Sequence, residues 1–132
     1  MNAEPEIINS THRVLIVEDN PDVADMLNLL LIEWGQETRI AYDPPKALEL
    51  SEKFKPQVVL LDIGLPKMHG YALARLLREK PWGRDLCIIA VTGWGQEADR
   101  QQSRAAGINH HLLKPVDPDQ LRELLMSVEP RE

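Results

Sequence analysis

The sequence predicts an α/β domain built on a doubly wound parallel sheet, and three observations support this prediction. Residues 58–61 read Val-Val-Leu-Leu, an apolar run without polar alternation that is typical of a strand buried on both faces. Further short strand-like segments recur along the chain, and segments with the three-and-four apolar spacing of helices separate them. Strands that alternate with helices imply parallel pairing through right-handed crossovers.

Five segments are expected to be strands because they are short, carry branched apolar residues and are bounded by turn residues. The second of them alternates only weakly, which suits an edge strand. The third ends abruptly in a carboxylate, Asp62. In chain order the five segments are residues 13–17, 37–41, 58–62, 86–91 and 110–113.

Five helices are expected after these strands. Pro21 and Pro44 suit the first position of the first two helices, because the missing N–H of proline has no helical partner there. Asn20 or Asp19 would cap the first helix. The helix expected at 96–106 has only alanines where large apolar side chains would anchor it, so we expect it to be loosely held. The inward-facing residues expected on the other four helices are Val23, Met26, Leu27, Leu30, Leu31 and Trp34, then Ala47, Leu48 and Phe54, then Leu73, Leu76 and Leu77, and finally Leu121, Leu124, Leu125 and Val128.

Together these elements predict a flavodoxin-like fold, with strand order 2-1-3-4-5 and helices on both faces of the sheet. The chain has 132 residues, which is enough for one domain with a buried core. We expect this domain to span residues 12–129. A polar tail at 1–11, expected to be disordered, and a short tail at 130–132 would flank it.

Composition limits the possible functions. The net charge of -6 argues against a general nucleic-acid binder, which needs a basic surface to displace counterions from phosphates. No apolar run approaches the roughly 18 residues of a membrane span, and the polar start of the chain is unlike a signal peptide. The single cysteine, Cys87, excludes an internal disulfide. We therefore expect a cytoplasmic protein without a nucleic-acid or membrane partner.

Polar residues stand directly after several of the predicted strands. In the order 2-1-3-4-5 the first and third strands are neighbours, which places Glu18 and Asp19 beside Asp62. Thr92 and Lys114 follow the fourth and fifth strands at the same edge. All five side chains should therefore converge on one pocket, where ligands bind in open α/β sheets.

The chemistry of this set points to phosphoryl transfer. Three clustered carboxylates repel one another unless a cation lies among them, and all-oxygen ligands suit Mg²⁺. A carboxylate such as Asp62 can act as a nucleophile and form an aspartyl-phosphate. Such a transfer needs little beyond positioning and charge neutralisation, which Mg²⁺ and the Lys114 ammonium would supply. The Thr92 hydroxyl and the backbone N–H groups of Ile63 and Gly93 are further candidate donors to the phosphoryl oxygens.

Over residues 13–128 the sequence resembles the receiver domain of two-component response regulators. The matching motifs are Glu18-Asp19 after the first strand, Asp62 with Pro66 and Gly70 downstream, Thr92-Gly93, and Lys114-Pro115.

This resemblance implies that Asp62 accepts a phosphoryl group from a sensor histidine kinase or a histidine phosphotransfer protein. It also implies that Asp19 binds Mg²⁺ directly, that Glu18 binds it through water, and that the backbone carbonyl of Gly64 is a further ligand. The protein would then be a signalling switch that slowly loses its own phosphoryl group, rather than an enzyme. The resemblance further implies a cis Lys114–Pro115 bond.

Each residue also has a purely structural explanation. Glu18 and Asp19 could merely cap a helix, and Asp62 could form a turn. Thr92 could simply end a strand, and Lys114 could be a solvated surface lysine. Their coincidence on one edge of the sheet favours the functional interpretation.

The cysteine and three of the histidines could in principle bind a metal, but we expect them to have no such role. Cys87 is expected to be a core thiol. The histidines at 12, 69 and 110 lack metal-ligand spacing, so we interpret them as surface residues and expect no zinc site.

Competing functions fail on specific residues. A phosphatase of the haloacid-dehalogenase type needs a second aspartate two positions after the first, where this chain has Gly64. A dinucleotide-binding enzyme needs a glycine-rich turn after the first strand, and a flavin-binding module needs a hydroxyl-rich phosphate loop there. The chain instead has Glu-Asp-Asn-Pro at 18–21. The remaining alternative is a pseudo-receiver, an interaction module that keeps the fold without phosphorylation.

Two positions suggest specific behaviour. Trp94 lies two residues after Thr92, where its indole could shield the phosphoryl group from water or could merely pack on the loop. His111 stands three residues before Lys114, where many receivers carry a tyrosine or phenylalanine that swings inward. Burying polar imidazole costs more than burying a phenyl ring, so we expect weaker or pH-dependent coupling to Thr92. The alternative is that His111 stays exposed in both states. The rearrangement would then lie mostly in the Gly93-Trp94-Gly95 loop and the following helix.

The sequence leaves the wider context open. We expect no effector domain after the last helix, so that output would pass through protein contacts. Residues 92–116 look more like receivers of hybrid histidine kinases than like chemotaxis regulators, whereas Met1 favours a stand-alone regulator.

Overall fold

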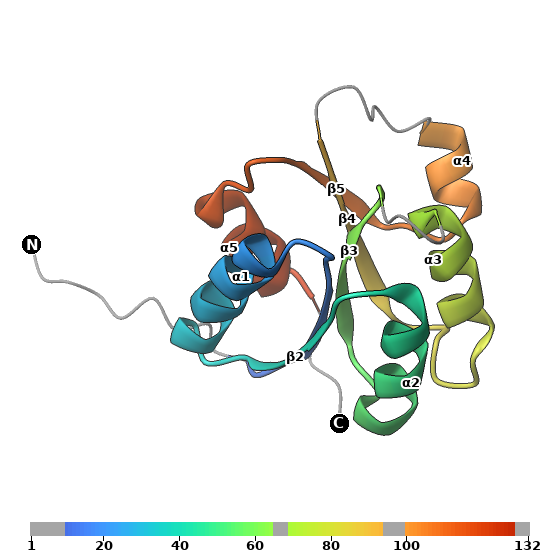
Figure 1. The fold of residues 1–132 in the computed structure, drawn as a ribbon, viewed down its shortest axis with the longest axis horizontal. Coiled ribbons are helices and arrows are strands. Elements are labelled where there is room, and N and C mark those ends of the chain that lie inside the picture. Colours follow the sequence, from blue (N-terminus) through green and yellow to red (C-terminus); the bar gives the residue numbers. More distant parts are fainter. Residues whose placement is uncertain (1–9, 65–68, 94–99, 129–132) are drawn as a thin grey trace, which may run out of the picture.

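The computed structural model describes residues 10–64, 69–93 and 100–128, which form a five-stranded parallel sheet covered by helices on both faces (Figure 1). The strands are β1 (Arg13–Val17), β2 (Glu37–Ala41), β3 (Val58–Asp62), β4 (Cys87–Thr92) and β5 (His110–Leu113). The helices are α1 (Pro21–Glu33), α2 (Pro44–Phe54), α3 (Gly70–Glu79), α4 (Arg100–Ala105) and α5 (Pro118–Met126). The strand order is β2-β1-β3-β4-β5, which confirms the predicted flavodoxin-like topology.

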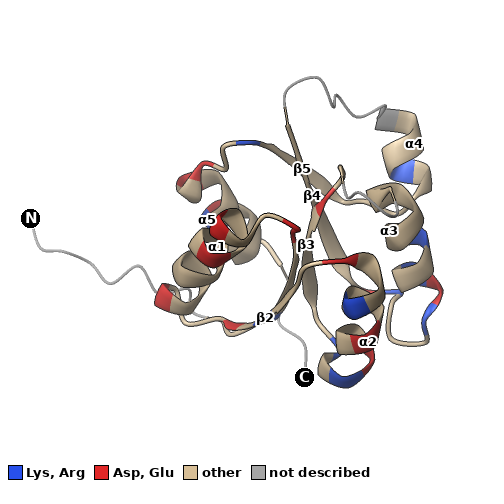
Figure 2. Ribbon diagram, viewed as in Figure 1, with Lys and Arg blue, Asp and Glu red and all other residues tan. Residues whose placement is uncertain are grey.

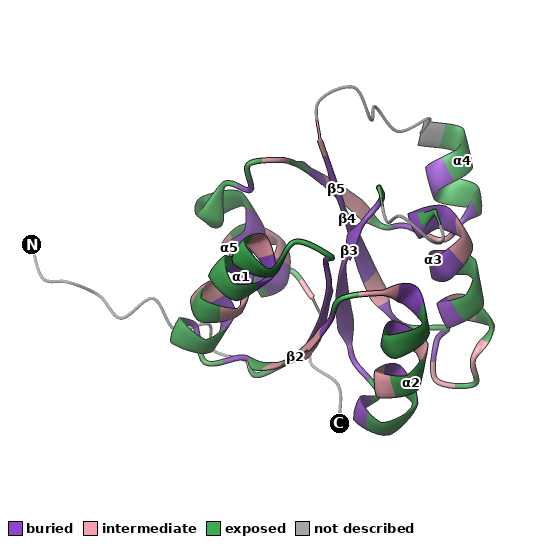
Figure 3. Cartoon of the chain, in the orientation of Figure 1, coloured by how far each residue is buried: buried purple, intermediate pink, exposed green. Residues whose placement is uncertain are grey.

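The sheet divides the core into two layers. α1 and α5 cover one face, and α2, α3 and α4 cover the other (Figure 1). Successive strand residues point to opposite faces, so Val14 and Ile16 pack in the layer of α1 and α5, while Leu15 and Val17 pack on the opposite side. All five residues of β3 are buried, as expected for the central strand of a parallel sheet (Figure 3).

Three residues, 18–20, separate the carboxyl end of β1 from the start of α1. The Asn20 side chain accepts hydrogen bonds from the N–H groups of Asp22 and Val23, and Pro21 occupies the first turn. The cap is thus Asn20 rather than Asp19. This leaves the Asp19 carboxylate available to the site described below.

Two predicted boundaries differ from the structure. β4 begins and ends one residue later than predicted, so Thr92 is the last residue of the strand rather than the first residue after it. α4 is described from Arg100 to Ala105, and the first four residues of the predicted helix, 96–99, lie outside the described residues.

Two predicted inward-facing residues are exposed. Met26 is 42% exposed and Leu76 is 36% exposed, so both predictions were wrong. Each directly precedes a residue of the buried helix face, Leu27 in α1 and Leu77 in α3. Because successive helical residues point about 100° apart, Met26 and Leu76 are turned away from the sheet once Leu27 and Leu77 face it.

His12 was predicted to lie on the surface, but its side chain is fully buried. Its Nδ1 lies 3.1 Å from Gln36 Oε1, and its Nε2 lies 3.3 Å from the Val128 carbonyl oxygen. These partners satisfy the ring away from water and connect the start of β1 to the end of α5. The prediction failed because both partners are remote in sequence.

The other side chains without a predicted ligand role are less buried. His69 is exposed, and both His110 and Cys87 are partly buried, so Cys87 is not the fully enclosed core thiol that we predicted. Within the described part of the chain, no helix is both long and apolar enough to cross a membrane.

Candidate functional site

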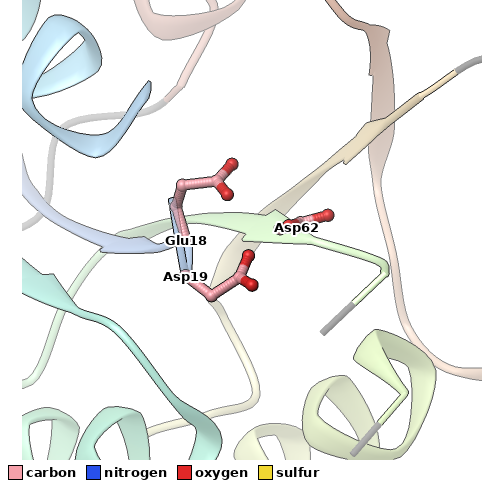
Figure 4. A group of neighbouring side chains, drawn as sticks. All are labelled: Glu18, Asp19 and Asp62. Atoms are coloured by element: carbon pink, nitrogen blue, oxygen red, sulfur yellow. The ribbon is translucent and has the colours of Figure 1, made fainter. Parts of the chain in front are cut away.

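Three carboxylates meet at the carboxyl edge of the sheet. Glu18 and Asp19 follow β1, Asp62 ends β3, and one oxygen of each lies within 4.8 Å of the others (Figure 4). Glu18 and Asp62 are buried, with 2% and 5% exposure, whereas Asp19 is exposed. The parallel pairing of β1 with β3 brings these strand ends together, as the sequence predicted.

Backbone and side-chain hydrogen bonds fix Glu18. Its N–H donates to the Ala41 carbonyl oxygen at the end of β2 (3.1 Å), which extends the β1–β2 ladder by one residue. Its Oε2 accepts a hydrogen bond from the Asn20 N–H (3.1 Å). One oxygen of this carboxylate is therefore already engaged with the protein.

The Lys114 ammonium lies between two of the carboxylates. Its Nζ is 3.0 Å from Glu18 Oε1 and 3.5 Å from Asp62 Oδ2. The Lys114 N–H donates to the Thr92 carbonyl oxygen (2.7 Å), so the ends of β4 and β5 hold its backbone. The Lys114–Pro115 bond is cis, as the resemblance implied.

The electrostatics of this cluster are unbalanced. Burial raises the pKa of Glu18, although the Asn20 N–H and the Lys114 ammonium act in the opposite direction. Burial alone would lower the pKa of Lys114, but its hydrogen bond to Glu18 and the nearby charge of Asp62 outweigh burial and raise it. One ammonium thus pairs with two of the three clustered carboxylates, an arrangement that a further cation would stabilise.

The backbone donor next to Asp62 differs from the predicted one. The Ile63 N–H donates to the Val91 carbonyl oxygen (3.2 Å), because the ladder between β3 and β4 continues one residue beyond the strand. The Gly64 N–H instead donates to Asp62 Oδ1 (3.0 Å). The Ile63 N–H, predicted as a donor to the phosphoryl oxygens, is thus engaged in the ladder, and the amide that donates to the Asp62 carboxylate is that of Gly64.

Thr92 and His111 occupy neighbouring strands. Thr92 is 7% exposed at the end of β4, and Gly93 after it is partly buried. His111 is partly buried on β5, and its Nε2 forms a hydrogen bond with Ser103 Oγ of α4. The sequence analysis missed Ser103, because nothing in the sequence pairs a helical serine with a strand histidine. Trp94 lies outside the described residues.

The donor set fits a magnesium ion. All candidate ligand atoms are carboxylate or carbonyl oxygens, which Mg²⁺ prefers. In the described ranges, Glu18, Asp19 and Asp62 are the one group of three acidic, histidine or cysteine residues whose ligand atoms lie this close together. Gly64, whose carbonyl was predicted as a ligand, is exposed beside Asp62.

Several known proteins are similar to this chain. A 14.6 kDa protein of the sodA1 3′ region of Leptolyngbya boryana is 38% identical over 112 residues, which is 85% of this chain and 86% of that protein. The chemotaxis protein CheY4 of Vibrio cholerae matches with a TM-score of 0.84 at 25% identity, covering 91% of this chain and all of that one.

The receiver domain of the Pseudomonas aeruginosa sensor histidine kinase PA1611, solved with a magnesium ion in its active site cleft, has a TM-score of 0.80 at 29% identity. The match covers 90% of this chain and 98% of the PA1611 receiver domain. Two other relatives are much longer. The chain spans 45% of the DNA-binding transcriptional regulator RpaA of Synechocystis and 13% of the histidine-protein kinase BarA of Shigella flexneri.

The family model that matches describes the response regulator receiver domain, and the match covers residues 14–126. This span contains every strand from β2 to β5, all but the first residue of β1, and all five helices. The chain therefore belongs to the response regulator receiver domain family.

Proposed function

We propose that this protein is a phosphoacceptor switch in which Asp62 takes a phosphoryl group from a sensor histidine kinase or a histidine phosphotransfer protein. The observation that carries the proposal is the environment of Asp62, a buried carboxylate 3.5 Å from the Lys114 ammonium and grouped with Glu18 and Asp19. An Asp62 oxygen attacks the phosphorus, and the bond from phosphorus to the donor imidazole breaks. The imidazole keeps the electron pair and takes up a proton from water.

Each residue of the site has a part in this transfer. Glu18, Asp19, Asp62 and the Gly64 carbonyl would hold Mg²⁺, which supplies positive charge to the phosphoryl oxygens. The Lys114 ammonium pairs with another phosphoryl oxygen. The Thr92 hydroxyl and the N–H groups of Gly64 and Gly93 donate hydrogen bonds to these oxygens. In this proposal the protein acts in the cytoplasm and turns over no separate substrate.

Incubation with acetyl phosphate tests this function without a partner protein. With Mg²⁺, intact-protein mass spectrometry should detect the mass of one phosphoryl group on the chain, and the gain should disappear when the metal is chelated. The pseudo-receiver alternative predicts no gain under either condition. That result would leave the fold as an interaction module and refute the phosphoacceptor function.

The response to phosphorylation is expected to involve Thr92, His111 and α4. The hydrogen bond between His111 and Ser103 supports this expectation, because it connects β5 directly to α4. Structures with and without beryllofluoride, a phosphoryl mimic, should differ mainly over residues 93–106. If the His111 ring swings fully inward at neutral pH while that segment stays fixed, the proposed response is wrong.

Trp94 is proposed to shield the phosphoryl group from hydrolysis. If its indole restricts the attacking water, the phosphorylated Trp94→Ala variant should lose its phosphate several times faster than the wild type. The loss can be followed by mass spectrometry after the acetyl phosphate has been removed. Equal rates of loss would eliminate the shield.

The exposed face of α1 offers a docking surface for the phosphodonor protein. Leu29 is 68% exposed, Ile32 is 53% exposed and Met26 is 42% exposed. Acidic residues border this apolar strip, and α1 contains no lysine or arginine (Figure 2). A hollow of about 400 Å³ lies over it, lined by Asp22, Asp25, Met26, Leu29, Leu30 and Glu33. Because α1 starts two residues after Asp19, a donor helix with apolar and basic residues could bind here beside the site.

Leu29→Glu should therefore slow phosphotransfer from the protein donor by about tenfold or more, since it places a charge in the apolar contact. Labelling by acetyl phosphate, which is too small to need a docking surface, should be unchanged. Met126→Glu, which changes an apolar residue of α5 that is 57% exposed, is the control. Equal rates of protein-dependent transfer in the wild type and Leu29→Glu would exclude α1 as the docking surface.

A further inference from the structure

Arg78 of α3 donates hydrogen bonds only to neutral oxygens of the described residues. Its Nη1 donates to the Leu86 carbonyl oxygen (2.6 Å) and, more weakly, to the carbonyl oxygens of Gly83 and Arg84. Its Nε and Nη2 donate to the Gly107 carbonyl oxygen at 3.0 and 2.6 Å, and its Nη2 also donates to Asn109 Oδ1 (2.6 Å). This guanidinium therefore connects α3 to the segments before β4 and before β5.

The segment after α4 is fixed by this network. Asn109 Oδ1 also accepts the Ile88 N–H of β4 (2.8 Å), and the Asn109 N–H donates to the Ile88 carbonyl oxygen (2.8 Å). Gly107 has φ +90°, and a Cβ at this position would lie 2.8 Å from Arg78 Nε. The guanidinium thus fits closely against the backbone that leaves α4.

α4 itself is buried much less. Of its side chains at 101–105 only Ser103 is buried, and the other four are exposed (Figure 3). The hydroxyl of Ser103 bonds to His111 of β5. A helix with little buried apolar surface opens at a lower free energy than the packed core to which its end is attached.

We propose that Arg78 is a fixed pivot for α4, so that the helix opens and closes from the sheet while residues 107–109 stay in place. The Ser103–His111 hydrogen bond holds the closed position. This motion is a property of the unphosphorylated chain and does not depend on the proposed phosphoacceptor function. Phosphorylation of Asp62 would only change how far the equilibrium lies toward the open position.

Amide hydrogen exchange of the metal-free, unphosphorylated protein tests the pivot. One amide reports on α4, and two report on the segments that Arg78 holds in place. The Ala106 N–H donates to the carbonyl oxygens of Gln102 (3.0 Å) and Ser103 (3.1 Å) and reports on α4. The N–H groups of Ile88 and Asn109 report on the anchor. In the wild type, Ala106 should exchange at least about tenfold faster than the other two. Exchange of all three at one rate would refute a pivot.

Two variants separate the Ser103–His111 hydrogen bond from the hydrogen bonds of Arg78. Ser103→Ala should speed exchange at Ala106 by about tenfold and leave Ile88 and Asn109 unchanged. Arg78→Lys cannot form the fork of hydrogen bonds and should speed exchange at Ile88 and Asn109 as well. Arg75→Lys, the same change at an exposed position of α3, should alter none of them.

Other outcomes would overturn the proposal. If Ser103→Ala deprotects Ile88 and Asn109 as strongly as Ala106, α4 and the anchor open together and no pivot exists. If Arg78→Lys leaves Ile88 and Asn109 as protected as in the wild type, the guanidinium is not the anchor. Should Arg78→Lys fail to fold, Gly107→Ala is the substitute, because its Cβ presses on Arg78 and should give the same pattern.

Discussion

The Asp62→Asn variant is expected to gain no phosphate from acetyl phosphate under conditions in which the wild type gains one group per chain. The amide of asparagine has no nucleophilic carboxylate oxygen, and Asp62 is the residue that ends β3, the strand paired with β1 and β4. The change should leave the fold intact, because the Lys114–Glu18 ion pair at 3.0 Å does not involve Asp62.

Intact-protein mass spectrometry measures the labelling, and circular dichroism checks that the variant is folded. Asp25→Asn is the matched control, since Asp25 is an exposed residue of α1 and its change should leave labelling at the wild-type level. A full phosphoryl gain by Asp62→Asn would mean that the phosphorylated residue lies elsewhere.

Magnesium binding should depend more on Asp19 than on Glu18. Glu18 already shares its oxygens with the Asn20 N–H and the Lys114 ammonium, whereas Asp19 is exposed and has no ion pair among the described residues. We therefore expect Asp19→Ala to weaken Mg²⁺ binding by about a hundredfold and Glu18→Ala by about tenfold. Titration calorimetry measures both affinities, with Asp25→Ala as the control. Equal losses would contradict the proposed roles of the two acids.

The pH dependence of Mg²⁺ binding follows from the raised pKa of Glu18. A carboxyl group with a raised pKa remains protonated at a higher pH than its ordinary 4.5, and only the deprotonated form attracts the metal. Affinity should thus be full above the folded pKa and should fall as the pH is lowered through it. The stability of the metal-free protein should change in the opposite direction. The protonated Glu18 stabilises the folded state, and this contribution is lost as the pH rises through the folded pKa.

The fold and the position of the candidate site follow from the amino-acid sequence. Apolar strands that alternate with helices leave few topologies, and in the one observed the carboxyl ends of β1 and β3 are adjacent. Polar residues placed directly after those strands had to meet, so the grouping of Glu18, Asp19 and Asp62 was predictable without coordinates. The prediction required only chain order and the direction of the strands.

Features that depend on contacts between distant segments could not be predicted from the sequence. Helical spacing could not show that Met26 faces solvent, because that depends on how α1 is rotated against the sheet. The burial of His12 depends on its contacts with Gln36 and Val128. Which amide faces Asp62 depends on how far the β3–β4 ladder continues, and the ladder engages Ile63 and leaves Gly64. Likewise, Arg78 donates a hydrogen bond to Asn109, which lies 31 positions away in the sequence. Such partners are set by packing, which sequence periodicity does not encode.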